Sequence, residues 1–392
     1  MERIRIEPRP DWRATVESQG LHFHTDEEKP YWDESAYYRF TTAQIDELER
    51  ATYRLNELCL QAVQHVVDHH QELFPLFSIP EPFYNWILQS WDQDEFTLYG
   101  RFDFAFDGQS PPKLLEYNAD TPTALLEASV VQWFWLQDLR TRQGGQLDQF
   151  NSLHERLIEA WQAYAPKARG TVHFTTCRGY LEDFLTVSYL RDTAIQAGLK
   201  TEYLHVDDLR WDQSTGFFVQ GVGEENRPDY YEAPIFNLFK LYPWEWLMRE
   251  EFGQYLAAAH TRWLEPPWKL LLSNKAILPV LYQLDPRCPY LLPADHRPFG
   301  DSYVKKPTMA REGACVTLME NGQPLAQTDG MEFYQEGPFV YQQLHRLPNF
   351  DGNYPVVGSW LINGWAAGIG IRESDTLITG NTSRFVPHVV SG

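Results

Sequence analysis

The chain has 392 residues, of which 43% are hydrophobic and 15% aromatic, and its formal net charge is −21. The hydrophobic and aromatic content excludes a disordered protein. The negative charge argues against nucleic acid as a partner, because an acidic surface repels phosphate backbones. We expect the charge to serve solubility, although it could also attract a cationic substrate.

The cysteines and the apolar segments indicate the compartment in which we expect the protein. Its four cysteines lie far apart, and no Cys/His spacing typical of a metal site joins them. The sequence shows neither the apolar core of a signal peptide nor an apolar run of membrane-spanning length. We therefore expect a protein of the reducing cytoplasm that makes no contact with a membrane.

The first long element predicted along the chain is an amphipathic helix. Its apolar residues recur roughly at helical spacing, and they are Ile45, Leu48, Leu55, Leu58, Val63 and Val66. His69 and His70 follow at its end. Because adjacent residues on a helix face different directions, we interpret these histidines as exposed surface rather than as metal ligands.

Two segments with strict alternation follow and predict a pair of strands. Residues 98–106, LYGRFDFAF, place the phenylalanines on one face and Arg101 and Asp103 on the other. Residues 114–120, LLEYNAD, alternate in the same way. If the two segments pair antiparallel with their apolar faces on the same side, Asp103 lies opposite Glu116 or Asn118.

This polar face has two interpretations that the residues alone leave open. Carboxylate and amide oxygens are hard ligands that suit Mg²⁺, and two facing carboxylates repel each other unless a cation lies between them or one is protonated. Alternatively, the face is solvated and Arg101 neutralises the acids.

The residues after these strands predict a helix start. Asp120 or Thr121 can cap the helix. Pro122 then takes the first helical position, Thr123 follows, and the helix continues as ALLEASVVQWFWLQDL. Its free N–H groups would form an anion site beside the polar face, for a phosphate or a carboxylate. An ordinary capped helix without a ligand is the alternative.

A second unit is predicted from about residue 171. VHFTT is a predicted strand, CRGY a turn, residues 180–198 a helix and TEYLHV another strand. This βαβ order is typical of parallel strand pairing.

From about residue 268 the sequence predicts strands joined by tight turns. SYVKKP, ACVTLME and FVYQQL are predicted strands, TMAREG is a glycine-containing loop, and ENGQ and LINGW carry the Asn-Gly signal of hairpins. Lys305 and Lys306 point to opposite faces of their strand, so only one can serve an interior site. The glycine-containing loop could donate N–H groups to phosphates, or it could be part of a solvated hairpin.

Arg372 follows a glycine-rich apolar strand, where a backbone can approach a ligand closely. Its guanidinium suits contact with a phosphate or an acyl phosphate, or else it pairs on the surface with Glu373 or Asp375. No Ser/His/Asp or Cys/His arrangement is evident, and we interpret Cys315 as a small filler residue. Since no Gly/Ser linker separates domains, we expect interleaved subdomains in one compact body.

The chain carries, in this order, the motifs R-F-D, L-E-Y-N-A-D, Y-V-K-K-P with R-E-G, G-S-W and G-I-R-E. Together they resemble the glutathionylspermidine synthetase-like family over nearly the whole chain. The resemblance implies an α+β, ATP-grasp fold with a pre-ATP-grasp-like βαβ region at about 165–265. It also implies an antiparallel lid with the nucleotide-binding region at about 268–345, and a metal and catalytic core at 98–140 and 346–392. Members of the family use ATP to join a carboxylate to an amine through an acyl phosphate, and only their synthetase region matches this chain.

The resemblance also implies roles for individual residues. The implied Mg²⁺ ligands are Asp103, Glu116 and Asn118. The implied ATP-binding residues are Lys275, Lys306, Gly313, Gln342 or Gln343, and Arg372. The implied substrate contacts are Arg101, Thr121 and Thr123 for the acid, and Glu182 and Asp183 for the amine. Arg372 and Arg101 are the implied catalytic residues, and the two acids near the amine could instead be ordinary helix-start acids.

Two segments depart from the family's pattern where glutathione would bind. The bifunctional members read about K-T-x-x-W-E where this chain reads KLYPWE, and they have small serine-containing residues where TPTALL follows N-A-D. The expected reaction therefore joins a carboxylate, such as glutathione or another short peptide or amino acid, to a polyamine-like or simple amine. The alternatives are a catalytically idle ATP- or peptide-binding protein and a kinase that stops at phosphorylation.

Overall fold

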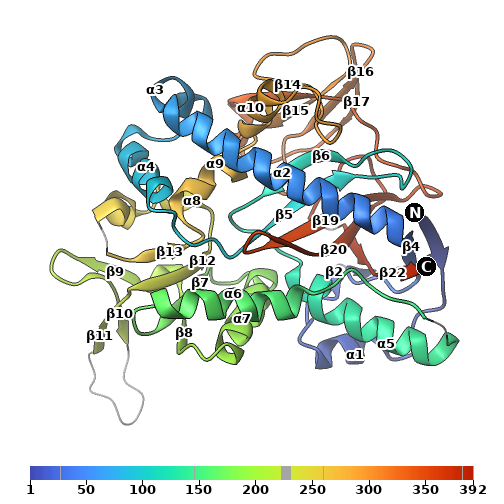
Figure 1. Ribbon diagram of the computed structural model, residues 1–392, viewed down its shortest axis with the longest axis horizontal. Coiled ribbons are helices and arrows are strands. Elements are labelled where there is room, and N and C mark those ends of the chain that lie inside the picture. Colours follow the sequence, from blue (N-terminus) through green and yellow to red (C-terminus); the bar gives the residue numbers. More distant parts are fainter. Residues whose placement is uncertain (27, 145, 222–230, 259, 382, 392) are drawn as a thin grey trace.

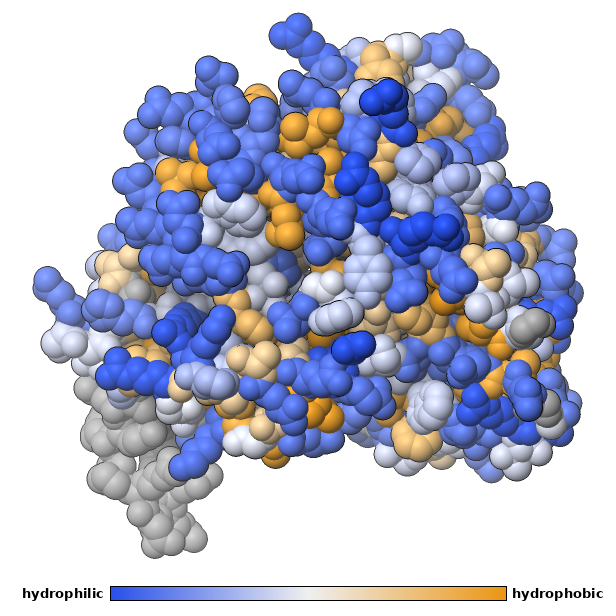
Figure 2. Space-filling model, in the orientation of Figure 1, coloured by the Kyte–Doolittle hydropathy of each residue, from blue (hydrophilic) through white to orange (hydrophobic). Residues whose placement is uncertain are grey.

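The computed structural model describes residues 1–26, 28–144, 146–221, 231–258, 260–381 and 383–391. These residues form a mixed α+β fold in which helices pack around several separate sheets (Figure 1). On the face seen in Figure 2, hydrophilic side chains predominate and hydrophobic ones form small separate patches. Within these ranges, no helix combines the length and the apolar character needed to cross a bilayer.

The central sheet is antiparallel and joins two distant parts of the chain. Its strand order is β21-β20-β19-β5-β6. The strands are β5 (Tyr99–Ala105), β6 (Lys113–Asn118), β19 (Tyr354–Ile362), β20 (Trp365–Ser374) and β21 (Arg384–Val386). The alternation predicted for the first of these is confirmed, because Phe102 and Phe104 are fully buried in the core whereas Arg101 and Asp103 line a cavity.

The predicted amphipathic helix is α2 (Thr42–Asp68), which lies across the central sheet (Figure 1). Thr41 and Gln44 form a capping box at its start, since each side chain accepts a hydrogen bond from the other residue's backbone N–H. Every predicted apolar position of the helix is buried. At its end His69 is exposed, as predicted, whereas His70 is half-buried.

A four-stranded parallel sheet follows in the chain and has the order β13-β12-β7-β8. Its strands are β7 (Val172–Thr176), β8 (Thr201–His205), β12 (Asn237–Leu241) and β13 (Arg262–Leu264). Helix α7 (Leu181–Gln196) connects the first two, so the predicted parallel βαβ unit is confirmed. Beside this sheet lies a small antiparallel meander of β9 (Leu209–Asp212), β10 (Gly216–Gly221) and β11 (Tyr231–Pro234).

The third large sheet, called here the lid sheet, is antiparallel with the order β14-β18-β15-β16-β17. Its strands are β14 (Ala294–Asp295), β15 (Tyr303–Pro307), β16 (Thr317–Glu320), β17 (Gln323–Gln327) and β18 (Phe339–Gln343). Both Asn-Gly hairpins are confirmed, because Asn321-Gly322 and Asn363-Gly364 join adjacent strands with positive φ at both residues.

The two ends of the described chain share one small sheet, in which β4 (Ala36–Thr41) lies between β1 (Glu2–Arg5) and β22 (His388–Ser391). Both termini therefore lie on the same side of the molecule (Figure 1). The remaining strands are β2 (Thr25–Asp26) and β3 (Lys29–Pro30). The remaining α-helices are α1 (Trp12–Ser18), α3 (His70–Leu73), α4 (Tyr84–Asp92), α5 (Gln132–Gln143), α6 (Leu153–Tyr164), α8 (Trp244–Leu247), α9 (Leu270–Ser273), α10 (Ile277–Leu284) and α11 (Glu332–Gln335).

The chain is interleaved, since the central sheet combines residues 99–118 with residues 354–386. The strands of each large sheet fall within one of the three predicted subdomains, and those of the central sheet come from both of its ranges, 98–140 and 346–392. The division of the chain into those subdomains stays a prediction.

The predicted helix start after β6 is wrong. Residues 121–124 are not helical, Ala124 has a φ of 66°, and the helical segment begins only at Leu125. It passes through a π-helical turn at Glu127–Val131 before α5 begins. The physical reason is that the Asp120 carboxylate does not cap the segment that follows it, because it accepts hydrogen bonds from the Lys240 side chain and from the Trp244 backbone N–H at the start of α8.

Candidate active site

A cavity of about 240 Å³ lies where the central sheet, the lid sheet and the end of β12 meet. All residues with a predicted site role line it, apart from Glu182, and they are Arg101, Asp103, Glu116, Asn118, Thr121, Thr123, Asp183, Lys275, Lys306, Gly313, Gln342, Gln343 and Arg372. Glu182 instead borders a small separate hollow together with Leu21, Phe23 and Glu127. The fold thus brings the predicted residues together, while the role of each stays a prediction.

The lining of the cavity falls into two parts. In the strand-built part, polar side chains project from β5, β6, β15 and β18, and Lys275 contacts them. In the loop-built part, the walls are the segments 121–124, 241–246, 310–316 and 377–379, with Asp183 at the start of α7. Arg372 projects from β20 toward the second part, where it contacts loop residues.

The strand-built part contains the predicted pair of carboxylates. Asp103 lies opposite Glu116, and Arg101 lies opposite Asn118, so the predicted antiparallel pairing is confirmed. The Asn118 amide, as assigned, donates to Asp103 Oδ2 at 3.0 Å and to Glu116 Oε1 at 3.3 Å. Three oxygen-bearing side chains therefore converge on one point of the sheet.

Cations compensate the two carboxylates in the structure. Arg101 donates to both oxygens of Asp103, from Nε at 2.6 Å and from Nη2 at 3.0 Å. Lys275 Nζ lies 3.0 Å from Glu116 Oε2. Burial by itself would raise the pKa of Glu116, but Lys275 and Lys306 lower it to about 2, so the carboxylate is charged at neutral pH.

Of the alternative interpretation, the structure confirms that Arg101 neutralises Asp103. The face is only partly solvated, because Arg101 is 7% and Asp103 8% exposed whereas the Glu116 side chain is 29% exposed. The donor set fits Mg²⁺, which prefers carboxylate and amide oxygens and keeps several of its waters. Rotation of the Asn118 amide by 180° would turn its oxygen toward the carboxylates. A bound Mg²⁺ would then balance the negative charge of Asp103 and Glu116, which Arg101 and Lys275 balance in this structure.

Lys306 and Gln342 form the lid side of the strand-built part. Lys306 Nζ donates to Gln342 Oε1 at 2.8 Å and to the Leu115 carbonyl at 2.9 Å. Burial lowers the pKa of Lys306 to about 8, although the charge of Glu116 opposes this shift. Lys305 instead lies over the Phe339 ring, so the prediction that one lysine alone serves the interior is confirmed.

The two glutamines predicted to lie on the adenine side differ in exposure. Gln342 is buried and its amide donates to the Leu114 carbonyl at 2.9 Å, whereas Gln343 is exposed. Both line the cavity.

The glycine-containing loop of the lid packs directly on another loop. Gly313 has a φ of 70°, and a Cβ added there would lie 2.6 Å from the Thr379 carbonyl oxygen. A side chain at this position would therefore push apart two walls of the cavity. Cys315, two residues on, does not line the cavity, and burial raises the pKa of its thiol, in keeping with a filler role.

Arg372 pairs with neither of the acids considered as surface partners, since Glu373 and Asp375 both bind Arg384. Instead Arg372 Nη2 donates to the carbonyl oxygens of Gly380, at 2.5 Å, and Asn381, at 3.3 Å. Its Nε is buried without a hydrogen-bond partner in the described part of the chain. A half-buried guanidinium with an unpaired donor suits an anion.

Sequence reasoning missed Arg311 and Glu245, which meet at the wall of the loop-built part. Arg311 Nη2 lies 3.1 Å from Glu245 Oε1, and Arg311 Nη1 donates to the Thr121 hydroxyl. Arg101 Nη1 reaches the Thr123 carbonyl at 2.7 Å. These contacts hold segment 121–124 in its non-helical form. Arg311 belongs to the R-E-G motif and Glu245 to the W-E motif, so both residues stood in motifs noted in the sequence. No local pattern indicates that the two motifs meet.

A fully buried ion pair supports the same wall from behind. Lys240 Nζ lies 2.5 Å from Asp120 Oδ1, and neither side chain is exposed. Burial lowers the pKa of Lys240, against the opposing charge of Asp120. Lys240 also lies 4.1 Å from the centre of the Trp244 ring.

Acidic side chains gather at the start of α7. Burial, together with the charges of Glu182 and Glu312, raises the pKa of Asp183 to about 7. Burial and the charge of Glu182 likewise raise the pKa of Glu127 to about 7, and the Tyr31 hydroxyl donates to Glu127 at 2.7 Å. Glu127 was missed because its position depends on the π-helical turn, which the sequence does not reveal.

Comparison with known proteins gives one family. The family described as glutathionylspermidine synthase preATP-grasp matches residues 3–391. The chain is 39% identical to a candidate acid–amine ligase of Haemophilus influenzae, covering 99% of both chains. It is 28% identical to a bifunctional glutathionylspermidine synthetase/amidase of Escherichia coli, covering 97% of this chain and 62% of that protein.

The solved structures agree on the fold. A glutathione synthetase-like effector from Globodera pallida superposes with a TM-score of 0.59 at 11% sequence identity, covering 98% of each chain. With the family match, this likeness confirms the predicted α+β, ATP-grasp fold.

Proposed function

The chain belongs to the glutathionylspermidine synthase family and is an acid–amine ligase of the ATP-using, ATP-grasp kind, and we propose that it couples a small carboxylic acid to an amine through an acyl phosphate. The candidate acid is a short peptide such as glutathione or a related compound, and the candidate amine is polyamine-like. Because its four cysteines are unpaired, we further propose the reducing cytoplasm as its location.

The strand-built part of the cavity would bind ATP. Lys275 and Lys306 would exchange their present partners for phosphate oxygens, with the adenine toward Gln342 and Gln343 and the lid loop at Gly313 over the phosphates. Mg²⁺, held by the carboxylate pair and Asn118, would offset phosphate charge when bound. The support for these roles is that the described side chains supply two cations, two carboxylates and an amide at one place.

The acid would be held where the two parts of the cavity meet. Arg101, Thr121 and Thr123 would orient its carboxylate, one oxygen of which attacks the γ-phosphorus of ATP as ADP leaves. Arg372 would stabilise the negative charge on the phosphoryl group in transfer, since it lines the cavity and its Nε has no hydrogen-bond partner in the described part of the chain.

The amine would enter beside the acids at the start of α7. Asp183 lines the cavity, and its neighbours Glu182, Glu312 and Glu127 add negative charge around it. A carboxylate with a pKa of about 7 can attract an ammonium ion and then accept a proton from it. The free amine attacks the acyl carbon, an amide bond forms, and inorganic phosphate leaves.

The observation that carries this function is that the residues implied by family resemblance, apart from Glu182, come from segments between residues 101 and 372 and yet line one cavity. That clustering supports a single site for ATP, acid and amine. We also propose that residues 98–140 and 346–392 form the metal and catalytic core, about 268–345 the lid, and about 165–265 the pre-ATP-grasp-like region.

A thermal-shift screen followed by a phosphate-release assay tests the function. Glutathione, shorter γ-glutamyl and glycine-ended peptides and free amino acids are each combined with spermidine, putrescine or hydroxylamine. A true ligand raises apparent stability by mass action, by about 2.7 kcal/mol at a hundredfold excess over Kd. We expect at least one acid to bind in the presence of an ATP analogue and Mg²⁺, and phosphate release to require both acid and amine.

Two outcomes would contradict this. Tight ATP binding without phosphate release for any pair would favour an idle binding protein. Phosphate transfer to the acid that needs no amine for turnover would favour a kinase.

A further inference from the structure

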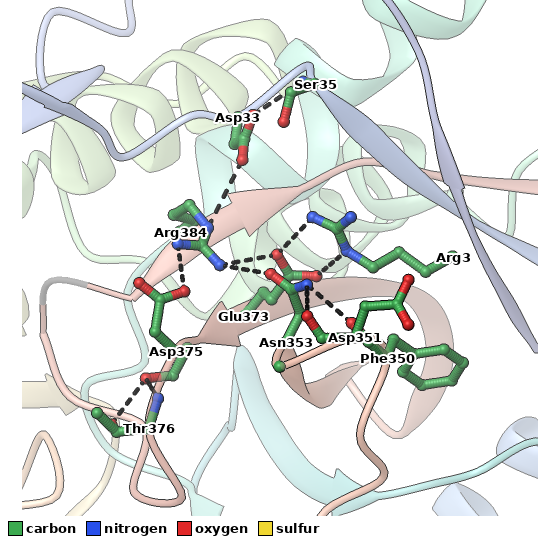
Figure 3. A network of polar contacts seen from close by, with 12 residues as sticks. Arg3, Asp33, Ser35, Phe350, Asp351, Asn353, Glu373, Asp375, Thr376 and Arg384 are labelled. Atoms are coloured by element: carbon green, nitrogen blue, oxygen red, sulfur yellow. Dashed lines mark hydrogen bonds and ion pairs between the residues drawn. The ribbon is translucent and has the colours of Figure 1, made fainter.

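Glu373 is the centre of a buried ion cluster on the side of β20 opposite the cavity (Figure 3). Arg3 donates to both of its oxygens, from Nε at 2.7 Å and Nη2 at 2.9 Å. Arg384 Nη2 donates to it at 3.0 Å and the Tyr38 hydroxyl at 2.5 Å. Burial by itself would raise the pKa of Glu373, but Arg3 and these hydrogen bonds lower it, so the carboxylate is charged.

The cluster joins elements that are remote in the chain. Arg3 lies on β1, Tyr38 on β4 and Arg384 on β21, and all of them meet a carboxylate on β20. Arg384 is further held by the Asn353 amide oxygen at 3.0 Å. Because buried ions are costly unless every one of them is paired, such a cluster fixes the position of the strand that carries its centre.

The residue next to Glu373 is Arg372, and the alternation of the strand turns it to the cavity. Among the residues that the structure describes, the Arg372 side chain donates only to the carbonyls of Gly380 and Asn381. Its direction therefore depends on where the loop 375–381 lies.

The same ion cluster holds the base of that loop. Arg384 Nη1 lies 2.7 Å from Asp375 Oδ1, at the first residue of the loop. Thr376 continues the turn, since its backbone N–H donates to the Ser374 hydroxyl and its own hydroxyl donates to the Ile378 carbonyl (Figure 3 shows the base of this turn). Arg384 thus contacts β20 through Glu373 and the loop 375–381 through Asp375.

We propose that Glu373 and Arg384 are positioning residues for Arg372, which aim its guanidinium into the cavity from behind the strand and through the loop 375–381. Their function depends on the role proposed above for Arg372. They touch neither ATP nor the acid, and they act on turnover by fixing the direction of a group that does.

A double-mutant cycle on kcat separates positioning from general stabilisation. Glu373→Gln removes the central charge but keeps the shape, and it is made in the wild-type chain and in Arg372→Lys. The rate measured is that of phosphate release from ATP in the presence of Mg²⁺. The substrates are the acid–amine pair that reacts fastest in the screen described above, or that acid with hydroxylamine as the amine. Glu2→Gln is the matched control, because Glu2 lies beside Arg3 on β1 but pairs with Arg39 at the surface, and its side chain is 63% exposed.

We expect Glu373→Gln to lower kcat by roughly 10–100-fold while the KM for ATP changes by less than about 3-fold, since a small misplacement of a charged group costs about that much in rate. In Arg372→Lys the same substitution should cost less than about 3-fold, because the group to be positioned is already altered. Glu2→Gln should leave kcat unchanged. Amide hydrogen exchange of residues 375–381 should become faster in Glu373→Gln and not in Glu2→Gln.

The experiment distinguishes a failure of the role proposed for Arg372 from a failure of the positioning role. If Arg372→Lys leaves kcat unchanged, the role proposed for Arg372 is wrong. If Arg372→Lys lowers kcat but Glu373→Gln does not, or if the two losses multiply, the positioning role alone is wrong.

If Glu373→Gln fails to fold, Asp375→Asn replaces it in the cycle, because the Asp375 side chain is 70% exposed and its loss leaves the buried centre intact. We then expect a loss in kcat of about 3–10-fold that again disappears in Arg372→Lys. An unchanged kcat in Asp375→Asn, or an equal loss in both backgrounds, would overturn the positioning role.

Discussion

The two parts of the cavity are built in different ways. In the strand-built part, the proposed metal ligands project from paired strands, and their spacing is fixed by the register of Asp103 against Glu116. In the loop-built part, position depends on ion pairs between segments far apart in the chain, as between Arg311 and Glu245. Hydrogen-bonded strands hold side chains more rigidly than loops do, and loops vary more easily.

This difference suggests a division of labour. The strand-built part offers a site for what every ATP-dependent ligase shares, namely phosphates and a metal. The loop-built part surrounds the place where the acid and the amine would lie, and it includes both segments that depart from the family's pattern. We expect substitutions in the first part to abolish chemistry and those in the second to change substrate preference.

The largest expected effect belongs to Arg372, at which the two parts meet. Arg372→Ala should lower kcat by ~10²–10³, because it removes a preorganised charge from the transferring phosphoryl group. Binding of an ATP analogue, measured by calorimetry, should stay detectable. An unchanged kcat would remove Arg372 from the catalytic group.

Glu116→Gln tests the strand-built part. Loss of one proposed ligand should raise the Mg²⁺ concentration for half-maximal phosphate release by roughly 10–100-fold, as losses around metal sites typically do. The control is Asp107→Asn, an exposed carboxylate in the turn of the same hairpin. If both variants keep the Mg²⁺ dependence of the wild type, the metal lies elsewhere.

Asp183→Asn tests the loop-built part. The KM for the amine should rise by about 10-fold while the KM for ATP is unchanged, because a charge-assisted hydrogen bond is lost. The wild-type pKa of about 7 predicts that the KM for the amine falls as pH rises from 6 to 8, since the carboxylate ionises over that range. The variant should show a weaker pH dependence.

Asp192→Asn, an exposed acid farther along the same helix, serves as its control. A rise in the KM for ATP equal to that for the amine in Asp183→Asn would mean that the two parts do not divide the substrates.

The smallest expected effect is the pH dependence of ATP binding. Because the pKa of Lys306 is lowered to about 8, the lysine is mostly charged at pH 7 and mostly neutral at pH 9. The Kd for ATP should therefore rise by about 5-fold over this range, given roughly 10-fold weaker binding by the neutral form. Lys306→Met should remove the dependence, whereas Lys305→Met should keep it. A Kd that is flat with pH in the wild type would take Lys306 away from the phosphates.

The division into a strand-built and a loop-built part also separates what the sequence could predict from what it could not. Strand alternation predicted the hairpin of β5 and β6 and placed Asp103 opposite Glu116 or Asn118, and the structure has Glu116. The two Asn-Gly signals predicted the turns at Asn321-Gly322 and Asn363-Gly364. These are local rules, and each needs only a few adjacent residues. Family resemblance then supplied the residues that the fold gathers in the cavity.

The errors come from contacts between distant segments. The helix predicted to start at Asp120 or Thr121 begins only at Leu125, because the Asp120 carboxylate is bound by Lys240, whose position the local sequence does not reveal. Glu127 was missed for the same kind of reason, since a π-helical turn and Tyr31 place it beside Glu182. Local propensity says nothing about such partners.

The most direct test of the proposed chemistry follows an oxygen atom. The acid that gives the fastest phosphate release is labelled with ¹⁸O in its carboxylate and incubated with ATP, Mg²⁺ and the amine. An acyl phosphate requires one carboxylate oxygen to attack phosphorus and leave with it, so each inorganic phosphate released during amide formation should contain one ¹⁸O atom. Amide product accompanied by unlabelled phosphate would contradict the acyl phosphate and, with it, the account of how this cavity works.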